Sequence, residues 1–273
     1  MLTKMNTINS QKVVLCFLGV MLLLINIYGE FNTLRPHEIH ESISDPSKFT
    51  EKELYYAINN TEGTRRTVVR QLNEIVNKGI SHYWDTTDEI KLNLNVPVWE
   101  NYILYALSFT GDTRFVNYEF ANYKKAIERG LGLCSQQSII LSELLLRRNI
   151  PAKIIGLDGH VIVSAEVDEN MWWILDPNKG VVIPHSINEV EKNPEIIEVY
   201  YKNAGYENLQ TMISYYGVEG NVHANEYGVI GFTKRKYVIE YVFYIFKWLL
   251  PILFFLPAML LLHRSNRPPA TIN

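Results

Sequence analysis

Three residues of this chain could together carry out acyl transfer through a thiol. Cys134 stands where a helical pattern begins, His160 opens an apolar run, and Asp176 closes another apolar run just before Pro177. A nucleophile, a base and a group that orients the base are the parts that this chemistry requires. Their order along the chain is Cys, His, Asp. We therefore take Cys134, His160 and Asp176 as the candidate catalytic residues.

Each of the three also has an ordinary structural interpretation. A lone cysteine is often a small buried core residue, a histidine at a strand start often has only a structural role, and an aspartate before proline often begins a turn. Metal binding is a rival use of the same side chains. The chain lacks paired spacings such as Cys-x-x-Cys or His-x-x-x-His, so we predict no metal and no cofactor. Order, helix start and hairpin geometry together favour catalysis.

The residues around Cys134 predict a buried helix that begins at the thiol. Gly130 and Gly132 permit a tight approach to it. Residues 135–148 then carry a wide apolar face, and Pro151 follows the end of the pattern. At a helix N-terminus, unpaired backbone N–H groups and the positive end of the helix dipole favour a thiolate.

The chain after this helix predicts an antiparallel hairpin that carries the base. Short β-like runs cover residues 153–157, 160–167 and 171–176. A three-residue loop between the last two would set Asp176 opposite Ile162, so that paired residue numbers add to 338. His160 then lies two residues along on the same face, within reach of Asp176. A five-residue loop would pair the two directly, whereas an even-membered loop would put them on opposite faces.

Two apolar segments bracket the polar middle of the chain. Residues 13–28, which include the second cysteine, Cys16, are typical of a signal-peptide core or a short signal anchor. The poor cleavage motif after them favours an uncleaved anchor. Residues 238–262 form a run of 25 residues, long enough to cross about 30 Å of hydrocarbon. Within this run, Lys247 could reach the interface or face Glu240 two turns away.

The charges that flank these segments bear on topology. Two spans place both termini on one side of a membrane, and Lys4, Lys12, Arg264 and Arg267 suit a cytoplasmic side. The Lys-Arg-Lys sequence at residues 234–236 favours the opposite orientation. Because the first anchor usually dominates, we expect the central domain outside the cytoplasm.

These observations divide the chain into five parts. They are an N-terminal membrane anchor (1–30), a linker (31–50), a central domain (51–236, with its core at 121–186), a C-terminal transmembrane helix (237–263) and a tail (264–273). Before Cys134, apolar spacing predicts helices over residues 51–59, 65–77, 99–108 and 117–129. Beyond Pro184, the same spacing predicts helices over residues 195–201 and 209–216 and a loop over residues 217–231.

The charge balance excludes one class of partner. The 273 residues include 26 Lys and Arg and 29 Asp and Glu, for a formal net charge of −3. Phosphate binding needs a basic face. We therefore do not expect nucleic acid as a partner.

The candidate residues lie in motifs that resemble the transglutaminase-like superfamily, a circularly related branch of papain-like cysteine enzymes. The resemblance covers residues 121–186 and consists of Gly-x-Cys-Ser at Cys134 with Ser138 four residues on, Gly-His-Val-x-Val at His160, and Trp-x-x-x-Asp-Pro at Asp176. It implies an α+β fold with a papain-like core and N-terminal helices, in which the cysteine begins a helix packed on an antiparallel sheet. Two transmembrane helices would flank that core.

The resemblance also implies the residue roles. Cys134 would be the nucleophile that forms an acyl-enzyme, His160 the base and Asp176 the orienter, and water or an amine would resolve the acyl-enzyme. The interval of 26 residues from Cys134 to His160 indicates a compact member, and no calcium site of the family is matched. The backbone N–H of Cys134 is one oxyanion donor, and the sequence leaves Tyr102, Tyr123 or Trp99 open as a second.

Three functions are compatible with these features. The first is a membrane-anchored, bacterial-type enzyme that performs acyl transfer or amide hydrolysis on a protein or peptide. The second is an enzyme-like assembly factor for cell-envelope or secreted polymers, whose acyl target lies on a partner protein. The third is a non-catalytic membrane scaffold that binds a peptide or a polymer-assembly partner. The intact trio disfavours the scaffold, because a binding module has no need of all three residues.

Overall fold

The chain folds into a mixed α+β structure with an antiparallel sheet, as the sequence predicted. The sheet has five strands. The computed structural model describes residues 2–36, 49–83, 92–217 and 220–265, with side chains described between residues 13 and 256. Two compact units make up the chain. The helical unit comprises Met1–Thr33, Asn95–Val116 and Tyr241–Asn273, and the sheet unit comprises Leu34–Leu94 and Asn117–Glu240.

The sheet has the strand order β4-β3-β2-β1-β5. Its strands are β1 (Ala152–Leu157), β2 (His160–Asp168), β3 (Met171–Asp176), β4 (Val181–Ile183) and β5 (Val222–His223). The three central strands lie close to the predicted ranges. β4 and β5 were not predicted, because runs of two or three residues are too short to show an alternating pattern.

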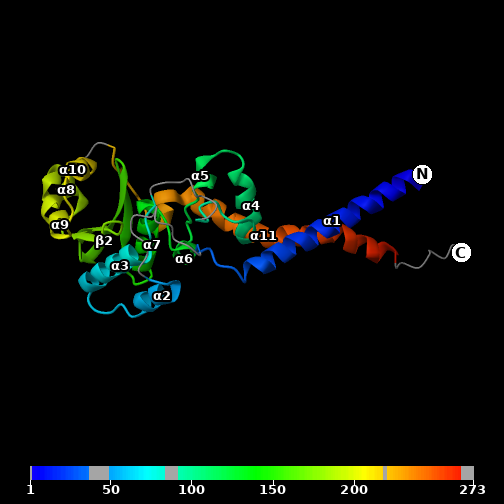
Figure 1. Ribbon diagram of the computed structural model, residues 1–273, viewed down its shortest axis with the longest axis horizontal. Helices are drawn as coiled ribbons and strands as arrows, with labels where there is room; N and C mark the ends of the chain where they lie inside the picture. The colour runs from blue at the N-terminus through cyan, green and yellow to red at the C-terminus, as the bar shows by residue number, and fades with distance from the viewer. Residues whose placement is uncertain (1, 37–48, 84–91, 218–219, 266–273) are drawn as a thin grey trace. The chain divides into compact units, whose positions relative to one another are not determined.

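Helices cover both faces of the sheet (Figure 1). α7 (Cys134–Leu146) packs on one face, where its Ile139 meets Ile154 of β1. The opposite face buries Ile155, Ile162 and Ile174 against the segments that follow β4. These segments are α8 (Ile187–Lys192), the 3₁₀ helix η1 (Pro194–Ile197), α9 (Glu198–Asn203) and α10 (Gln210–Tyr215). Burial on both faces explains why the central strands are nearly continuous apolar runs.

The β2–β3 hairpin reaches the predicted register by a route that the sequence did not reveal. Asp168 pairs with Met171, so the loop holds only two residues, an even number. A β-bulge between Glu166 and Asp168 then shifts the register, and from Glu166 onward paired residue numbers add to 338. The bulge supplies the one-residue correction that keeps His160 and Asp176 on the same face.

The N-terminal helices of the sheet unit largely follow their patterns. They are α2 (Glu51–Asn59), α3 (Arg65–Gly79) and α6 (Tyr123–Arg129). The predicted helix over residues 117–129 is wrong for its first half, since α6 begins only at Tyr123. Backbone groups that a helix would have used internally bond elsewhere: the Tyr118 N–H donates to the Leu94 carbonyl, and Phe120 exchanges two hydrogen bonds with the Gln136 side chain.

Part of the predicted linker is packed against the rest of the sheet unit. Leu34 is fully buried, its N–H donates to Glu128 over 3.1 Å, and its carbonyl accepts from Asn93 over 3.0 Å. Residues 37–48 of the predicted linker lie outside the described residues.

The helical unit contains α1 (Leu2–Gly29), α4 (Val98–Ser108), α5 (Thr113–Val116) and most of α11 (Gly228–Ser265). Among the described residues one helix, Gly228–Leu256, is long and apolar enough to cross a membrane, while the apolar part of α1, Val13–Gly29, is shorter. Lys247 donates to the Glu100 carbonyl over 2.8 Å. Glu240 accepts from the Ala121 and Asn122 N–H groups. Lys247 and Glu240 thus bind separate partners and do not face each other as a pair.

Candidate functional site

Cys134 is a free, half-buried thiol at the first residue of α7, where the sequence placed it. The approach to it requires glycine at two points. Gly130 has a left-handed backbone with φ +68°, and a Cβ on Gly132 would lie 2.4 Å from the Gln136 Cβ. Leu133 occupies the N-cap and makes no side-chain cap bond. The backbone N–H groups at this helix end therefore face the thiol region without a capping side chain.

Hydrogen bonds hold the start of α7 against two neighbouring segments. Ser138 donates from Oγ to the Val161 carbonyl over 3.0 Å, which ties the helix to β2 one residue beyond His160. Gln137 donates to the Ile80 carbonyl over 2.7 Å. Ser81 donates from its N–H to Gly130 and accepts from the N–H of Gly132, each over 2.9 Å. The thiol is thereby held beside the first residue of β2.

His160 and Asp176 form a buried pair. The distance from His160 Nε2 to Asp176 Oδ2 is 2.8 Å, and the two side chains are 6% and 0% exposed. Since Nε2 is used, Nδ1 is the ring nitrogen left for Cys134, whose thiol lies near enough to raise the pKa of the imidazole. The structure therefore brings all three candidate residues together.

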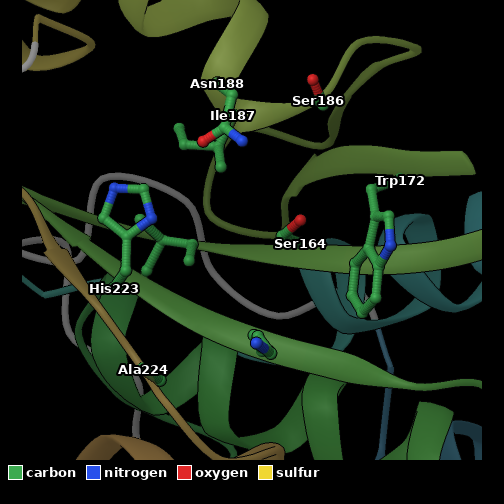
Figure 2. Close-up of a pocket in the computed structure, with 9 residues that line it drawn as sticks. Ser164, Trp172, Ser186, Ile187, Asn188, His223 and Ala224 are labelled. Atoms are coloured by element: carbon green, nitrogen blue, oxygen red, sulfur yellow. The ribbon is translucent and has the colours of Figure 1, made fainter. Parts of the chain in front are cut away.

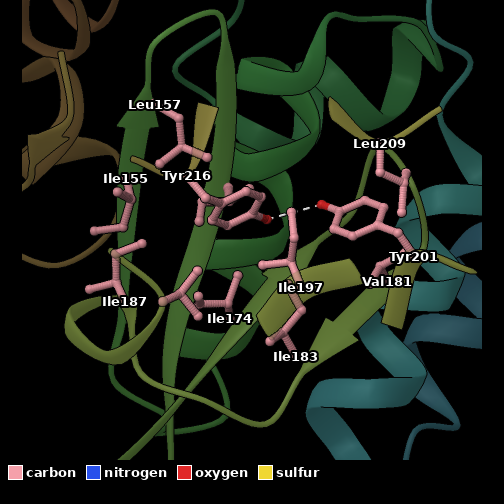
Figure 3. Packing of buried hydrophobic residues seen from close by; sticks show 12 residues of the cluster. Ile155, Leu157, Ile174, Val181, Ile183, Ile187, Ile197, Tyr201, Leu209 and Tyr216 are labelled. Carbon is pink, nitrogen blue, oxygen red and sulfur yellow. Dashed lines mark hydrogen bonds between the residues drawn. The ribbon is translucent and has the colours of Figure 1, made fainter. Parts of the chain in front are cut away.

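Asp176 receives further hydrogen bonds from groups that the sequence did not identify. The Tyr201 hydroxyl donates to Oδ2 over 2.6 Å, and the Lys179 N–H donates to Oδ1 over 3.0 Å. Tyr201 in turn lies 2.9 Å from the Tyr216 hydroxyl (Figure 3), and both tyrosines are fully buried. These donors satisfy a carboxylate that would otherwise be costly to bury. Tyr201 and Tyr216 lie in segments of mixed polarity, where no motif marks them.

The charges of the pair support each other. Burial alone would lower the pKa of His160, but the charge and hydrogen bond of Asp176, with a smaller effect of Cys134, raise it to about 10. Burial alone would raise the pKa of Asp176, but its interactions with His160, Tyr201 and Lys179 lower it below the usual 3.8. The favoured state is an imidazolium beside a carboxylate.

His82 is a second histidine near the pair and was not singled out from the sequence. Its Nδ1 accepts from Asn178 Nδ2 over 2.7 Å, and Asn178 lies two residues after Asp176. Burial lowers the pKa of His82 to about 4, and the nearby charges of Lys179 and His160 act in the same direction. His82 is therefore neutral at neutral pH. No local motif precedes it, so only the contact through Asn178 reveals its place.

His185 and His223 have partners away from the thiol. His185 Nε2 lies 3.0 Å from the Tyr200 hydroxyl, and His223 Nε2 lies 2.7 Å from Glu191 Oε1. Neither contact involves Cys134.

The structure places the three side chains that the sequence left open as oxyanion donors. Tyr123 packs with its ring 5.1 Å from the Arg147 guanidinium, at the far end of α7, and a helix of this length spans about 20 Å. Tyr123 is therefore wrong as an oxyanion donor. Trp99 and Tyr102 belong to the helical unit, where the Tyr102 hydroxyl donates to the Lys247 carbonyl over 2.8 Å. The backbone N–H of Cys134 stays the predicted donor to the oxyanion.

Arg129 organises the segment that leads to the thiol. It is fully buried, stacks on Phe120, and donates to the Leu131 carbonyl over 3.0 Å and to Gln136 Oε1 over 3.2 Å. A third bond goes to the Tyr118 carbonyl. One buried guanidinium thus serves two backbone carbonyls and a side-chain amide oxygen.

A pocket of about 230 Å³ lies elsewhere on the sheet (Figure 2). Its lining includes Lys153, Ser164, Trp172 and His223, and none of the three candidate residues takes part. Among the described residues, no group of three His, Cys, Asp or Glu side chains could hold a metal ion. Comparison with protein-family models, curated proteins and solved structures finds no match for this chain.

Replacement of Arg129 should destabilise the protein strongly. We expect Arg129→Ala to lower the free energy of unfolding by about 3 kcal/mol or more, because it removes three buried hydrogen bonds from a charged donor. Urea unfolding of the full chain in detergent, followed by tryptophan fluorescence, measures this. Lys202→Ala is the control, since it removes an exposed pair with Glu198 whose worth is about 1 kcal/mol or less. Equal effects of the two substitutions would contradict the role of Arg129.

The His160–Asp176 pair should make stability depend on pH in a defined window. The raised pKa of His160 stabilises the fold fully below 6.5, and this contribution is lost as pH rises toward about 10. The lowered pKa of Asp176 stabilises the fold above 3.8, and this contribution is lost as pH falls further. The stability deficit of Asp176→Asn should therefore be largest between these limits and shrink toward pH 10. A deficit that does not vary with pH would argue against the ion pair.

The Tyr201 hydroxyl should help to keep Asp176 ionised. In Tyr201→Phe the carboxylate loses its shortest donor, so its pKa should rise and acid unfolding should begin at a higher pH than in the wild type. Tyr206→Phe is the matched control, because that hydroxyl donates to the Lys179 carbonyl over 3.0 Å rather than to the carboxylate. Acid-unfolding midpoints from circular dichroism compare the variants, and identical midpoints in both would refute the assignment.

Proposed function

We propose that this protein is a thiol-dependent acyl transferase or amide hydrolase of the transglutaminase-like kind, held at a membrane and acting on a protein or peptide. The single observation that carries the proposal is the buried 2.8 Å hydrogen bond between His160 Nε2 and Asp176, which leaves Nδ1 to serve the thiol at the start of α7. A structural cysteine has no need of a nearby imidazole whose other nitrogen is fixed by a carboxylate.

The first half of the proposed reaction forms an acyl-enzyme. The proton of the Cys134 thiol resides on the His160 imidazolium, and the sulfur attacks as the thiolate on the carbonyl carbon of an amide. The carbonyl oxygen becomes an oxyanion that the backbone N–H of Cys134 stabilises. When the intermediate collapses, the carbon–nitrogen bond breaks, and the leaving amine takes the proton from His160. The product is a thioester on Cys134.

The second half restores the enzyme. Water or an incoming amine gives a proton to His160 as it attacks the thioester carbonyl. The carbon–sulfur bond breaks, and the Cys134 sulfur leaves as the thiolate beside the protonated His160. Asp176 holds the imidazole in one orientation throughout, and Tyr201 and the Lys179 N–H hold Asp176.

The membrane part of the proposal rests on the two apolar helices. α11 supplies 29 residues and α1 supplies the 17 residues of Val13–Gly29, a length at the lower limit for a transmembrane helix. With both termini in the cytoplasm, the sheet unit and its thiol would lie outside, where a single central cysteine has no intramolecular disulfide partner. Such a tether suits a substrate or polymer-assembly partner in the cell envelope.

Thiol reactivity tests the proposal directly. In a Cys16→Ser background of the full chain in detergent, Cys134 is the sole thiol. We expect His160→Ala to slow acylation of Cys134 by an activated-ester probe at neutral pH by about 100-fold or more, because the base is removed. Asp176→Ala should also slow it, and Cys134→Ala should abolish it.

His223→Ala is the control for this experiment, because His223 bonds to Glu191 and not to Cys134. It should leave the acylation rate unchanged. A rate that is equally indifferent to His160 and His223 would make Cys134 a structural cysteine. The scaffold interpretation would then take the place of the enzyme.

A further inference from the structure

The segment from α4 to Phe109 combines an apolar surface with inward-facing polar groups. Between Val98 and Gly111 the only charged residue is Glu100, which is buried at 3% exposure. Outward positions hold Val98 and Ala106, and Phe109 just after the helix is 73% exposed. In a freely soluble protein, this apolar surface would be exposed to water.

The polar atoms of α4 are used within the helical unit. The Glu100 carbonyl accepts from Lys247 Nζ over 2.8 Å, and Glu100 Oε1 accepts from the Tyr244 hydroxyl over 2.6 Å. The Tyr102 hydroxyl donates to the Lys247 carbonyl over 2.8 Å, and Asn26 Nδ2 donates to the same carbonyl over 2.6 Å. α4 is therefore bound to α11 through polar side chains, and Asn26 ties α1 to the same carbonyl of α11, while Val98 and Phe109 of the α4 segment stay exposed.

The level of these contacts along α1 and α11 is rich in aromatic residues. α4 meets α1 at its last residue, since a Cβ on Gly29 would lie 2.2 Å from the Trp99 carbonyl oxygen. It meets α11 at Tyr244 and Lys247, before the exposed apolar residues that continue to Leu256. The aromatic residues at or next to these contacts are Tyr28, Trp99, Tyr102, Tyr244 and Trp248. Tyrosine and tryptophan concentrate where a membrane meets water.

A kink sets the course of α4 at this level. Asn101 has non-helical backbone angles of φ −158° and ψ 98°, and its Oδ1 accepts from the N–H groups of Ile103 and Leu104 over 3.1 and 3.2 Å. Asn101 thus caps a second helical stretch inside α4 and satisfies its first donors. The turn lets the chain change direction without exposing unpaired N–H groups to an apolar surface.

We infer that α4 and Phe109 form an interfacial element that binds the surface of a lipid bilayer beside α1 and α11. Phe109, Val98 and Ala106 would lie at the boundary between headgroups and acyl chains, and the tyrosine and tryptophan rings at headgroup level. The occupant is lipid rather than a protein, because α4 is bonded to the apolar helix α11 among aromatic residues, and the first exposed charges beyond Phe109 are the Asp112–Arg114 pair, which headgroups can accommodate. The inference rests on the proposed membrane span.

Site-directed spin labelling tests this inference on the full chain. In a background with Cys16→Ser and Cys134→Ser, one nitroxide is attached in turn through Phe109→Cys, Tyr56→Cys or Ile252→Cys. Tyr56 is the matched water control, since it is 72% exposed on α2 of the sheet unit, against 73% for Phe109. Ile252 on α11 is 55% exposed and serves as the lipid control. The labelled chains are reconstituted into phosphatidylcholine and phosphatidylglycerol vesicles.

The measurement is the ratio of collision rates with oxygen, which concentrates in lipid, and with a water-soluble nickel complex. We expect this ratio to be several-fold higher at positions 109 and 252 than at 56. Ala106→Cys provides a second label on the same element if Phe109→Cys fails to fold.

Three outcomes would overturn the inference. Water-like ratios at 109 and 106 with a lipid-like ratio at 252 would refute it while leaving the span intact. A water-like ratio at 252 as well would refute the proposed span, and the interfacial element with it. A label at 109 that is immobile and shielded from both reagents would show that a protein, such as a second copy of this chain, covers the surface instead of lipid.

Discussion

The hydrogen bond between His160 and Asp176 is the interaction on which the sheet unit depends. A carboxylate with no exposed surface is tolerated only when donors surround it. The histidine provides one donor, and the remaining ones come from the Lys179 N–H and the Tyr201 hydroxyl. The segments after β4 therefore do more than cover an apolar sheet face. They carry Tyr201 to the buried Asp176 carboxylate, and the Tyr216 hydroxyl meets that of Tyr201 (Figure 3).

A single bulged residue decides whether this pair can form. Side chains alternate along a strand, so a hairpin shifted by one residue would turn Asp176 away from His160. The two-residue loop after Asp168 has the wrong parity, and the bulge between Glu166 and Asp168 restores it. Asn170, with φ +57°, adopts the left-handed conformation that such a tight turn needs. The register follows from the loop and the bulge together. Either one alone would place His160 and Asp176 on opposite faces of the sheet.

The helical unit also contains polar groups that need hydrogen-bond partners. Lys247, Asn26 and Glu100 are polar groups among apolar helices, and their hydrogen bonds are directed at one another across α1, α4 and α11. This explains why residues 95–116 join the terminal helices although they lie in the middle of the sequence. They bring the carbonyl and carboxylate that the lysine and Tyr244 require, and they leave an apolar exterior that is consistent with a lipid environment.

The sequence by itself determined the α+β class, the helix that begins at Cys134 and the three central strands. Those features follow from local periodicity and glycines, which act over a few residues. The tertiary structure alone decided the bulge that puts His160 and Asp176 on one face, the non-helical course of residues 117–122, the short edge strands, the membership of α4 in the helical unit, and the places of His82 and Tyr201. Each of these depends on contacts between side chains and backbone groups distant in the chain, and no local pattern encodes such contacts.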